Sequence, residues 1–167
     1  MEINDLIQSH QETRDQQQRA IFASLFIMEN RLQTIFDKTD PKVTLKQFML
    51  LVMLKFSSEE ESTLTNMGNL LGCSRQNIKK LAVSLEKYDL VKIHSDSGDK
   101  RKLKLYLTVD GLKYFEEIFS LHTQSLNKLF HNYSDSELQL FFKTLMMLYE
   151  GIEKLENEYN EKGKNRE

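Results

Sequence analysis

The apolar residues in the first third of the chain recur at the three- and four-residue steps of amphipathic helices. Five of them set the repeat between residues 18 and 36: Ile21, Leu25, Met28, Leu32 and Ile35. This spacing predicts a first helix over residues 18–36, after a polar arm at residues 1–18. Pro41 ends the pattern. Thr44 and Gln47 have the spacing of a capping box, so we expect a second helix to begin at Thr44.

The middle of the chain changes from helical spacing to alternation. Leu103, Leu105 and Leu107 alternate with polar or aromatic residues, as in a half-buried strand. The pattern predicts two short helices, then a strand pair with a turn at residues 96–99, then two long helices. Their ranges are 63–71, 74–88, 90–94, 103–107, 108–132 and from Ser134 onward, where Ser134 and Glu137 have the spacing of another capping box. The expected fold class is α+β and mostly helical, with about six helices and a two-stranded hairpin.

Length and composition add few constraints. With 167 residues, 40% of them hydrophobic, the chain suits a single domain over residues 1–167. The single cysteine excludes a disulfide within the chain and fits a reducing compartment. No signal-peptide pattern and no apolar run of ~20 residues are visible. We therefore expect a cytoplasmic protein with no membrane partner.

The charge is unevenly distributed. The net charge of the whole chain is −2, but residues 63–107 hold nine basic residues against four acidic ones. A basic middle between acidic ends is typical of a protein that meets phosphates with one surface. Chance clustering of solvated charges is the alternative, and charge alone does not separate the two.

Residues 63–74 read T-L-T-N-M-G-N-L-L-G-C-S, which predicts a helix-turn-helix. Gly72 permits the left-handed turn, Ser74 caps the next helix, and Gly68 lies where the two helices would cross. The exposed start of the second helix would carry five side chains able to bind bases or phosphates: Arg75, Gln76, Asn77, Lys79 and Lys80. By themselves these residues also fit an ordinary helical hairpin with a polar face.

The hairpin that follows favours the DNA-binding interpretation. The chain resembles the MarR family of winged helix-turn-helix transcriptional regulators over residues 18–159. The matching motifs are L-G-C-S-R-Q-N-I-K-K-L at 71–81, L-E-K-Y-D-L-V at 85–91 and D-K-R-K-L-K-L-Y-L-T-V-D-G at 99–111. In two places the chain departs from this pattern. Asp89 stands where such proteins commonly have glycine, and Leu105 replaces a frequent β-branched residue.

The resemblance implies a sequence-specific regulator that binds double-stranded DNA at a palindromic operator. The DNA-binding lobe would span residues 44–107. Arg101 at the wing tip would enter the minor groove, oriented by Asp99, which suits the attraction of narrow minor grooves for a guanidinium. The DNA-contacting set would then be Ser74, Arg75, Gln76, Asn77, Lys79, Lys80, Lys100, Arg101 and Lys102.

The last helix carries an apolar seam with alternating three- and four-residue steps. Its members include Leu138, Phe141, Leu145, Leu148, Ile152 and Leu155. The long helices at the two ends of the chain could pack within one chain. A palindromic site, however, needs two-fold symmetry. We therefore expect a homodimer built from residues 18–36 and 108–160. A small-molecule effector could bind between these helices and the DNA-binding lobe, and no pocket is assigned to it.

Other functions have weaker support. No catalytic motif is present, so we do not expect an enzyme. The four histidines are dispersed, so we predict no metal site and no cofactor. Two alternatives stay open. One is a winged helix that contacts proteins without binding DNA, and the other is a DNA-binding redox sensor that works through Cys73. We favour core packing for Cys73, since its place in the turn suits a small apolar residue.

Overall fold

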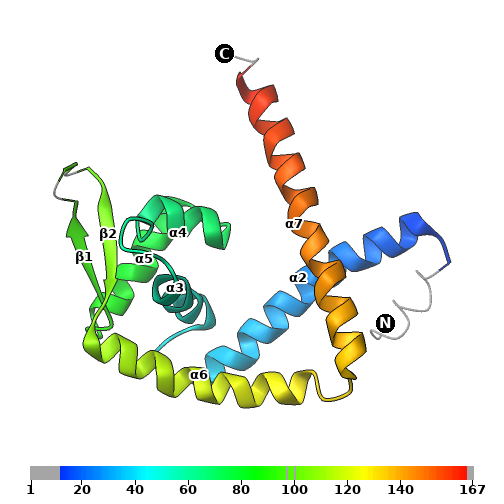
Figure 1. Cartoon of the computed structure of the whole chain (residues 1–167), viewed down its shortest axis with the longest axis horizontal. Coiled ribbons are helices and arrows are strands. Elements are labelled where there is room, and N and C mark those ends of the chain that lie inside the picture. The colour runs from blue at the N-terminus through cyan, green and yellow to red at the C-terminus, as the bar shows by residue number, and fades with distance from the viewer. Residues whose placement is uncertain (1–11, 97, 100, 165–167) are drawn as a thin grey trace. The chain divides into compact units, whose positions relative to one another are not determined.

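The computed structural model of the chain describes residues 12–96, 98–99 and 101–164. Residues 1–11 of the predicted polar arm, Ser97 in the predicted turn and Lys100 in the wing lie outside these ranges. The chain forms two compact units, Met1–Ser120 and Leu121–Glu167. Among the described residues there are six helices and one two-stranded sheet, so the predicted fold class is confirmed (Figure 1).

The first unit begins with α2 (Arg14–Thr39) and α3 (Leu45–Phe56). The helix α2 starts four residues before the predicted residue 18, so the prediction of a polar arm was wrong for residues 14–18. The cause is a capping box, in which Thr13 Oγ1 accepts from the backbone N–H of Gln16, and Gln16 Oε1 accepts from Thr13 N–H. The capping box predicted for Thr44 and Gln47 is present at the start of α3.

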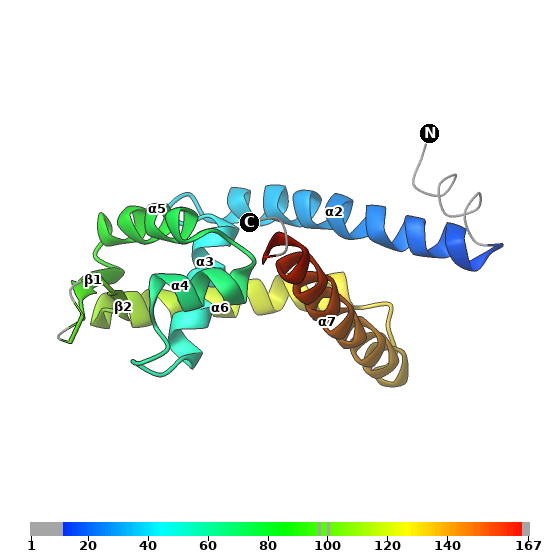
Figure 2. The same cartoon turned by 90° about the horizontal axis from the view of Figure 1, so that it is seen from above.

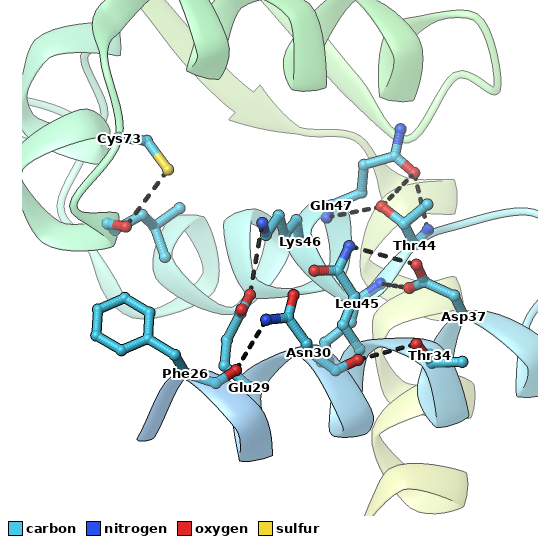
Figure 3. Close-up of polar contacts among 12 residues, drawn as sticks. Phe26, Glu29, Asn30, Thr34, Asp37, Thr44, Leu45, Lys46, Gln47 and Cys73 are labelled. Atoms are coloured by element: carbon cyan, nitrogen blue, oxygen red, sulfur yellow. Dashed lines mark hydrogen bonds and ion pairs between the residues drawn. The ribbon is translucent and has the colours of Figure 1, made fainter. Parts of the chain in front are cut away.

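Polar contacts fix α2 against the start of α3 (Figure 3). Asp37 Oδ1 of α2 accepts a 2.6 Å hydrogen bond from the backbone N–H of Leu45, one of the free donors of the first turn of α3. The next residue of α3, Lys46, has its Nζ 3.5 Å from Glu29 Oε1 of α2. Both contacts therefore hold the start of α3 against α2.

The helix α4 (Leu64–Leu71) leads through a short turn to α5 (Arg75–Glu86). The strands β1 (Val91–Ser95) and β2 (Leu103–Leu107) follow and pair antiparallel, with Val91 opposite Leu107 and Ser95 opposite Leu103. Figure 2 shows α3 packed with α4 and α5, and the hairpin beside α5. The hairpin also joins the segment before α4, because Leu105 N–H donates to Ser62 O at 2.8 Å.

The core of the first unit lies around α3. Leu50 and Leu51 are completely buried, and Phe48 stacks on Phe115 of α6 with ring centroids 5.7 Å apart. The burial of both neighbours, Leu50 and Leu51, shows that α3 is covered over more of its circumference than a single amphipathic stripe. The buried cluster also includes Leu64, Met67, Ile78, Ala82, Leu85, Leu90, Val91 and Leu105.

The helix α6 (Val109–Leu129) begins after Thr108, whose Oγ1 accepts from Gly111 N–H at 2.8 Å. The second unit holds the end of α6 and the whole of α7 (Asp135–Lys164). Ser134 and Glu137 form the capping box predicted for the start of α7. Glu137 has a pKa below its ordinary value because its carboxylate accepts hydrogen bonds from the Ser134 side chain and backbone. None of the described helices is long and apolar enough to cross a membrane.

Candidate nucleic-acid interface

The turn between α4 and α5 brings the two helices very close. Gly72 ends α4 in the left-handed conformation, with φ of 61°, where a side chain would be strained. A Cβ atom at Gly68 would lie 2.6 Å from the backbone oxygen of Cys73, so only glycine fits this crossing. Ser74 Oγ then accepts from Asn77 N–H at 3.2 Å and starts α5. The local sequence thus dictates where α5 begins and how it leaves α4.

The helix α5 has one buried and one exposed face. Ile78, Ala82 and Leu85 are buried in the core. The six residues predicted to contact DNA from this helix start are all exposed: Ser74, Arg75, Gln76, Asn77, Lys79 and Lys80. The structure therefore places them where a partner can reach them.

A shallow hollow of about 430 Å³ follows the exposed face of α5. Five of its six lining residues end in basic or polar groups, and the whole set is Gln76, Lys79, Lys80, Val83, Ser84 and Lys87. Sequence reasoning did not single out Val83 or Lys87. Val83 is 39% exposed, and its position seven residues after Gln76 on a helix was the signal that could have identified it.

The tip of the hairpin is organised by two carboxylates. Asp99 Oδ1 accepts from Arg101 N–H at 3.0 Å and from Arg101 Nε–H at 3.2 Å. These hydrogen bonds hold the pKa of Asp99 below its usual range. The Arg101 side chain is otherwise 92% exposed. Asp99 thus orients the guanidinium through its Nε–H, while the side chain as a whole stays exposed to a partner.

Asp96 closes the other side of the tip. Its Oδ2 lies 2.9 Å from Lys104 Nζ, and its Oδ1 accepts from the N–H groups of Gly98 and Asp99. The hydrogen bond from Lys104, followed by the two backbone donors, lowers the pKa of Asp96 to about 2. The carboxylate therefore stays charged at physiological pH and fixes the turn.

Asp89 connects α5 to the wing. It has a φ of 57°, the only positive φ among the described residues that are not glycine. Aspartate tolerates this conformation better than most residues, which explains how the chain accommodates its departure from the glycine common at this position. Lys92 pairs with the Asp89 carboxylate, and Thr108 Oγ1 donates to the Asp89 carbonyl. The strand β1 therefore leaves α5 at a fixed angle.

One contact between α5 and the wing was not predicted. Arg75 Nη2 donates a 3.1 Å hydrogen bond to the backbone oxygen of Arg101, 26 residues later in the chain. Both arginines line a second hollow of about 440 Å³, together with Glu60, Thr63, Leu64, Thr65, Asn66, Lys102 and Leu103. No local sequence signal could reveal this contact, because it depends on how the hairpin folds back onto α5.

Cys73 lies half-buried in the turn between α4 and α5 and packs against the hydrophobic core. Its Sγ donates to the Leu71 carbonyl oxygen at 3.4 Å, as Figure 3 also shows. Within the described ranges, no group of three or more metal-ligating side chains comes together. The environment of Cys73 is that of a packed small side chain.

The six seam residues predicted for dimerisation all lie on α7 of the second unit. Five of them are exposed in the single chain, from 38% for Leu138 to 56% for Leu155, and Leu145 is half-buried. In α6, Phe119, Leu126 and Leu129 are 49%, 44% and 47% exposed in the single chain.

Comparison with known proteins gives relatives of one kind. No family model matches the chain. The chain is 25% identical to the HTH-type transcriptional repressor YetL of Bacillus subtilis over 134 residues, which are 79% of this chain and 80% of YetL. Among solved structures, a MarR protein from Peptoclostridium difficile superposes with a TM-score of 0.73 at 24% identity. The match covers 80% of this chain and 88% of the MarR protein.

A second solved structure was determined with DNA. The MepR–DNA complex of S. aureus superposes with a TM-score of 0.71 at 19% identity, covering 78% of this chain and 97% of MepR. The expectation from residues 63–111 is thus confirmed at the level of the fold. The relatives found are named as transcriptional regulators.

Proposed function

We propose that this chain, which has the fold of the MarR-family regulators, is a transcriptional regulator that binds double-stranded DNA sequence-specifically as a homodimer. One observation carries the proposal. The exposed start of α5 lies next to a wing whose Arg101 is oriented by Asp99 and open to a partner. A helix with polar and basic side chains beside a basic hairpin is suited to read two adjacent grooves of DNA.

In this proposal α5 enters the major groove. Gln76 and Asn77 can each make a pair of hydrogen bonds to adenine, while Lys79 and Lys80 can bind guanine O6 and N7 or nearby phosphates. Val83, which lines the same hollow as Gln76, Lys79 and Lys80, can contact a thymine methyl group. The Ser74 hydroxyl and backbone lie at the first turn of α5, where helix N-termini bind phosphate. We therefore assign recognition of the DNA sequence to this face of α5.

The wing is assigned to the minor groove and its phosphates. Arg101 would insert where the groove is narrow, and Lys100 and Lys102 would neutralise phosphates on either side. Lys100 lies outside the described residues, so its part rests on the sequence. Because the minor groove distinguishes few base pairs, the wing contributes affinity and a preference for DNA shape.

A second copy of the chain is the proposed cover for the apolar seam on α7. Its side chains repeat at alternating steps of three and four residues, as in a helix that packs against another helix. Two copies related by a two-fold axis would present two α5 helices to major grooves about one turn apart, ~34 Å, which matches a palindromic operator. The proposal also includes a response to a small-molecule effector, for which no pocket is assigned.

Selection of bound fragments from a random pool of duplex DNA tests the proposal. The unaltered protein should enrich a two-fold symmetric motif, and the double variant Gln76→Ala, Asn77→Ala should lose that enrichment while it remains folded. A control variant, Lys143→Ala on α7, should enrich the same motif as the unaltered protein. If the unaltered protein enriched no motif, the DNA-binding proposal would be wrong and a protein-contacting winged helix would be favoured.

A further inference from the structure

Arg75 differs from the other exposed residues at the start of α5 in where its side chain goes. Gln76, Lys79 and Lys80 line the hollow along the exposed face of the helix. Arg75 lines the other hollow, with Arg101 and Lys102 of the wing. Its Nη2 donates to the Arg101 backbone oxygen at 3.1 Å. The guanidinium is therefore directed at the wing.

The tip of the wing has few other attachments. Residues 98, 99, 101 and 102 are its described part, and their other hydrogen bonds lie within residues 96–102. The hairpin is joined to the segment before α4 further down, where Leu105 N–H donates to Ser62 O and the Tyr106 hydroxyl donates to Glu59 Oε1. Within the described part of the tip, Arg75 thus supplies the hydrogen bond that comes from the helix-turn-helix.

The two contacts of Arg101 have complementary effects. Asp99 holds the Arg101 side chain by its Nε–H, and Arg75 holds the Arg101 main chain by its carbonyl oxygen. A hydrogen bond from a charged donor is stronger than one between neutral groups. Together they fix both the place and the direction of the wing-tip arginine relative to α5.

We infer that Arg75 is a positioning residue, which holds the wing tip against the first turn of α5 so that Arg101 is presented to the minor groove. This inference rests on the proposed function for the DNA step, and it reassigns Arg75 from reading bases to coupling the two DNA-facing elements. Sequence preference in the major groove would then come from Gln76 and the residues that share its hollow.

The first experiment needs no DNA. Backbone hydrogen exchange of residues 98–102 is compared between the unaltered protein, Arg75→Ala and Lys80→Ala, an exposed lysine of the same helix that does not line the wing hollow. Arg75→Ala should speed exchange at Lys102 N–H about threefold to tenfold, since a local opening becomes easier. Lys80→Ala should leave it unchanged, and Arg75→Lys should restore part of the protection. Equal exchange in Arg75→Ala and the unaltered protein would overturn the inference.

The second experiment measures DNA affinity in two backgrounds. Arg75→Ala should weaken binding about tenfold when Arg101 is present and less than about threefold in the Arg101→Ala background, because coupled residues are not additive. The base preference at every position of the half-site should persist. An equal loss in both backgrounds, with relaxed preference at one base pair, would show that Arg75 reads a base. If the unaltered protein bound no duplex at all, the proposed function would fail, and the exchange experiment would still decide the role of Arg75.

Discussion

Tyr114 of α6 donates its hydroxyl hydrogen to Oδ2 of Asp40, a residue of the loop between α2 and α3 that lies 74 positions earlier in the chain. The other oxygen of the Asp40 carboxylate accepts from the N–H groups of Lys42 and Val43. Burial, and then the hydrogen bond to Asp40, raise the pKa of Tyr114, so the hydroxyl stays protonated and donates. Asp40 is thereby satisfied although it is only 8% exposed.

Removing this donor should destabilise the first unit. Tyr114→Phe leaves a buried carboxylate oxygen without its partner, and we expect a loss of about 1–3 kcal/mol in the free energy of unfolding. Urea unfolding at a fixed protein concentration measures it. Tyr149→Phe, at a tyrosine that is 67% exposed, is the matched control and should change stability little. If Tyr114→Phe lost no more free energy of unfolding than Tyr149→Phe, Asp40 would have found a replacement partner.

The crossing of α4 and α5 provides a second prediction, which concerns two glycines. Gly68→Ala should strongly destabilise the protein, since the new Cβ would meet the Cys73 backbone oxygen at 2.6 Å. Gly151→Ala in α7 has nothing within 4 Å of the new atom and should stabilise its helix by about 0.5–1 kcal/mol. Thermal unfolding followed by circular dichroism should therefore shift in opposite directions for the two variants. An unchanged or raised unfolding temperature for Gly68→Ala would contradict the close approach at Gly68.

The wing turn provides a third prediction, which concerns pH. Asp96 is charged in the folded state down to a pKa of about 2, whereas an unfolded aspartate has a pKa of about 3.9. Its contribution to the folded wing is therefore complete above about pH 4 and is lost as the pH falls towards 2. Carbon-detected NMR titration of the Asp96 carboxyl should show the low midpoint. Lys104→Met should raise that midpoint, because it removes the largest cause of the shift.

The sequence was sufficient to predict the features that depend on neighbouring residues. The capping boxes at Thr44 and Ser134 and the turn at Gly72 have their partners within a few positions. The strand at residues 103–107 is recognisable from the alternation of its own side chains. These features are local, and side-chain chemistry decides them. The same rule, applied to Thr13 and Gln16, would have placed the start of α2 correctly.

Two kinds of feature were beyond sequence reasoning. The hydrogen bonds of Arg75 with Arg101 and of Tyr114 with Asp40 join distant segments. The sequence pattern around Arg75 or Tyr114 would be the same if its side chain lay in solvent. An apolar stripe shows that a helix face is buried but not by which chain. Phe119 belongs to such a stripe and is 49% exposed in the single chain.

The apolar seam of α7 provides a fourth prediction. Leu148→Glu and Leu155→Glu together would place two unpaired carboxylates in the proposed interface between two copies, each costing several kcal/mol. Sedimentation should show monomer or unfolded protein. The matched control carries Lys143→Glu and Asn157→Glu, which add two carboxylates to the same helix off the seam, and it should remain a dimer. A stable dimer of the seam variant would place the interface elsewhere.

The fifth prediction separates the roles of the two DNA-facing elements. Gln76→Ala should cost about 1–3 kcal/mol on the selected site and relax preference at one base pair, because its amide is proposed to read a base edge. Arg101→Ala should weaken binding more for A·T-flanked than for G·C-flanked sites, since a narrow groove attracts the guanidinium, and should leave the half-site preference intact. Lys102→Ala should lower the slope of log affinity against log salt by about 0.9, because one phosphate fewer is neutralised. Salt titrations on matched and scrambled duplexes measure all three. If Arg101→Ala changed neither affinity nor its dependence on flanking sequence, the wing would not contact DNA, and the proposed docking would be wrong.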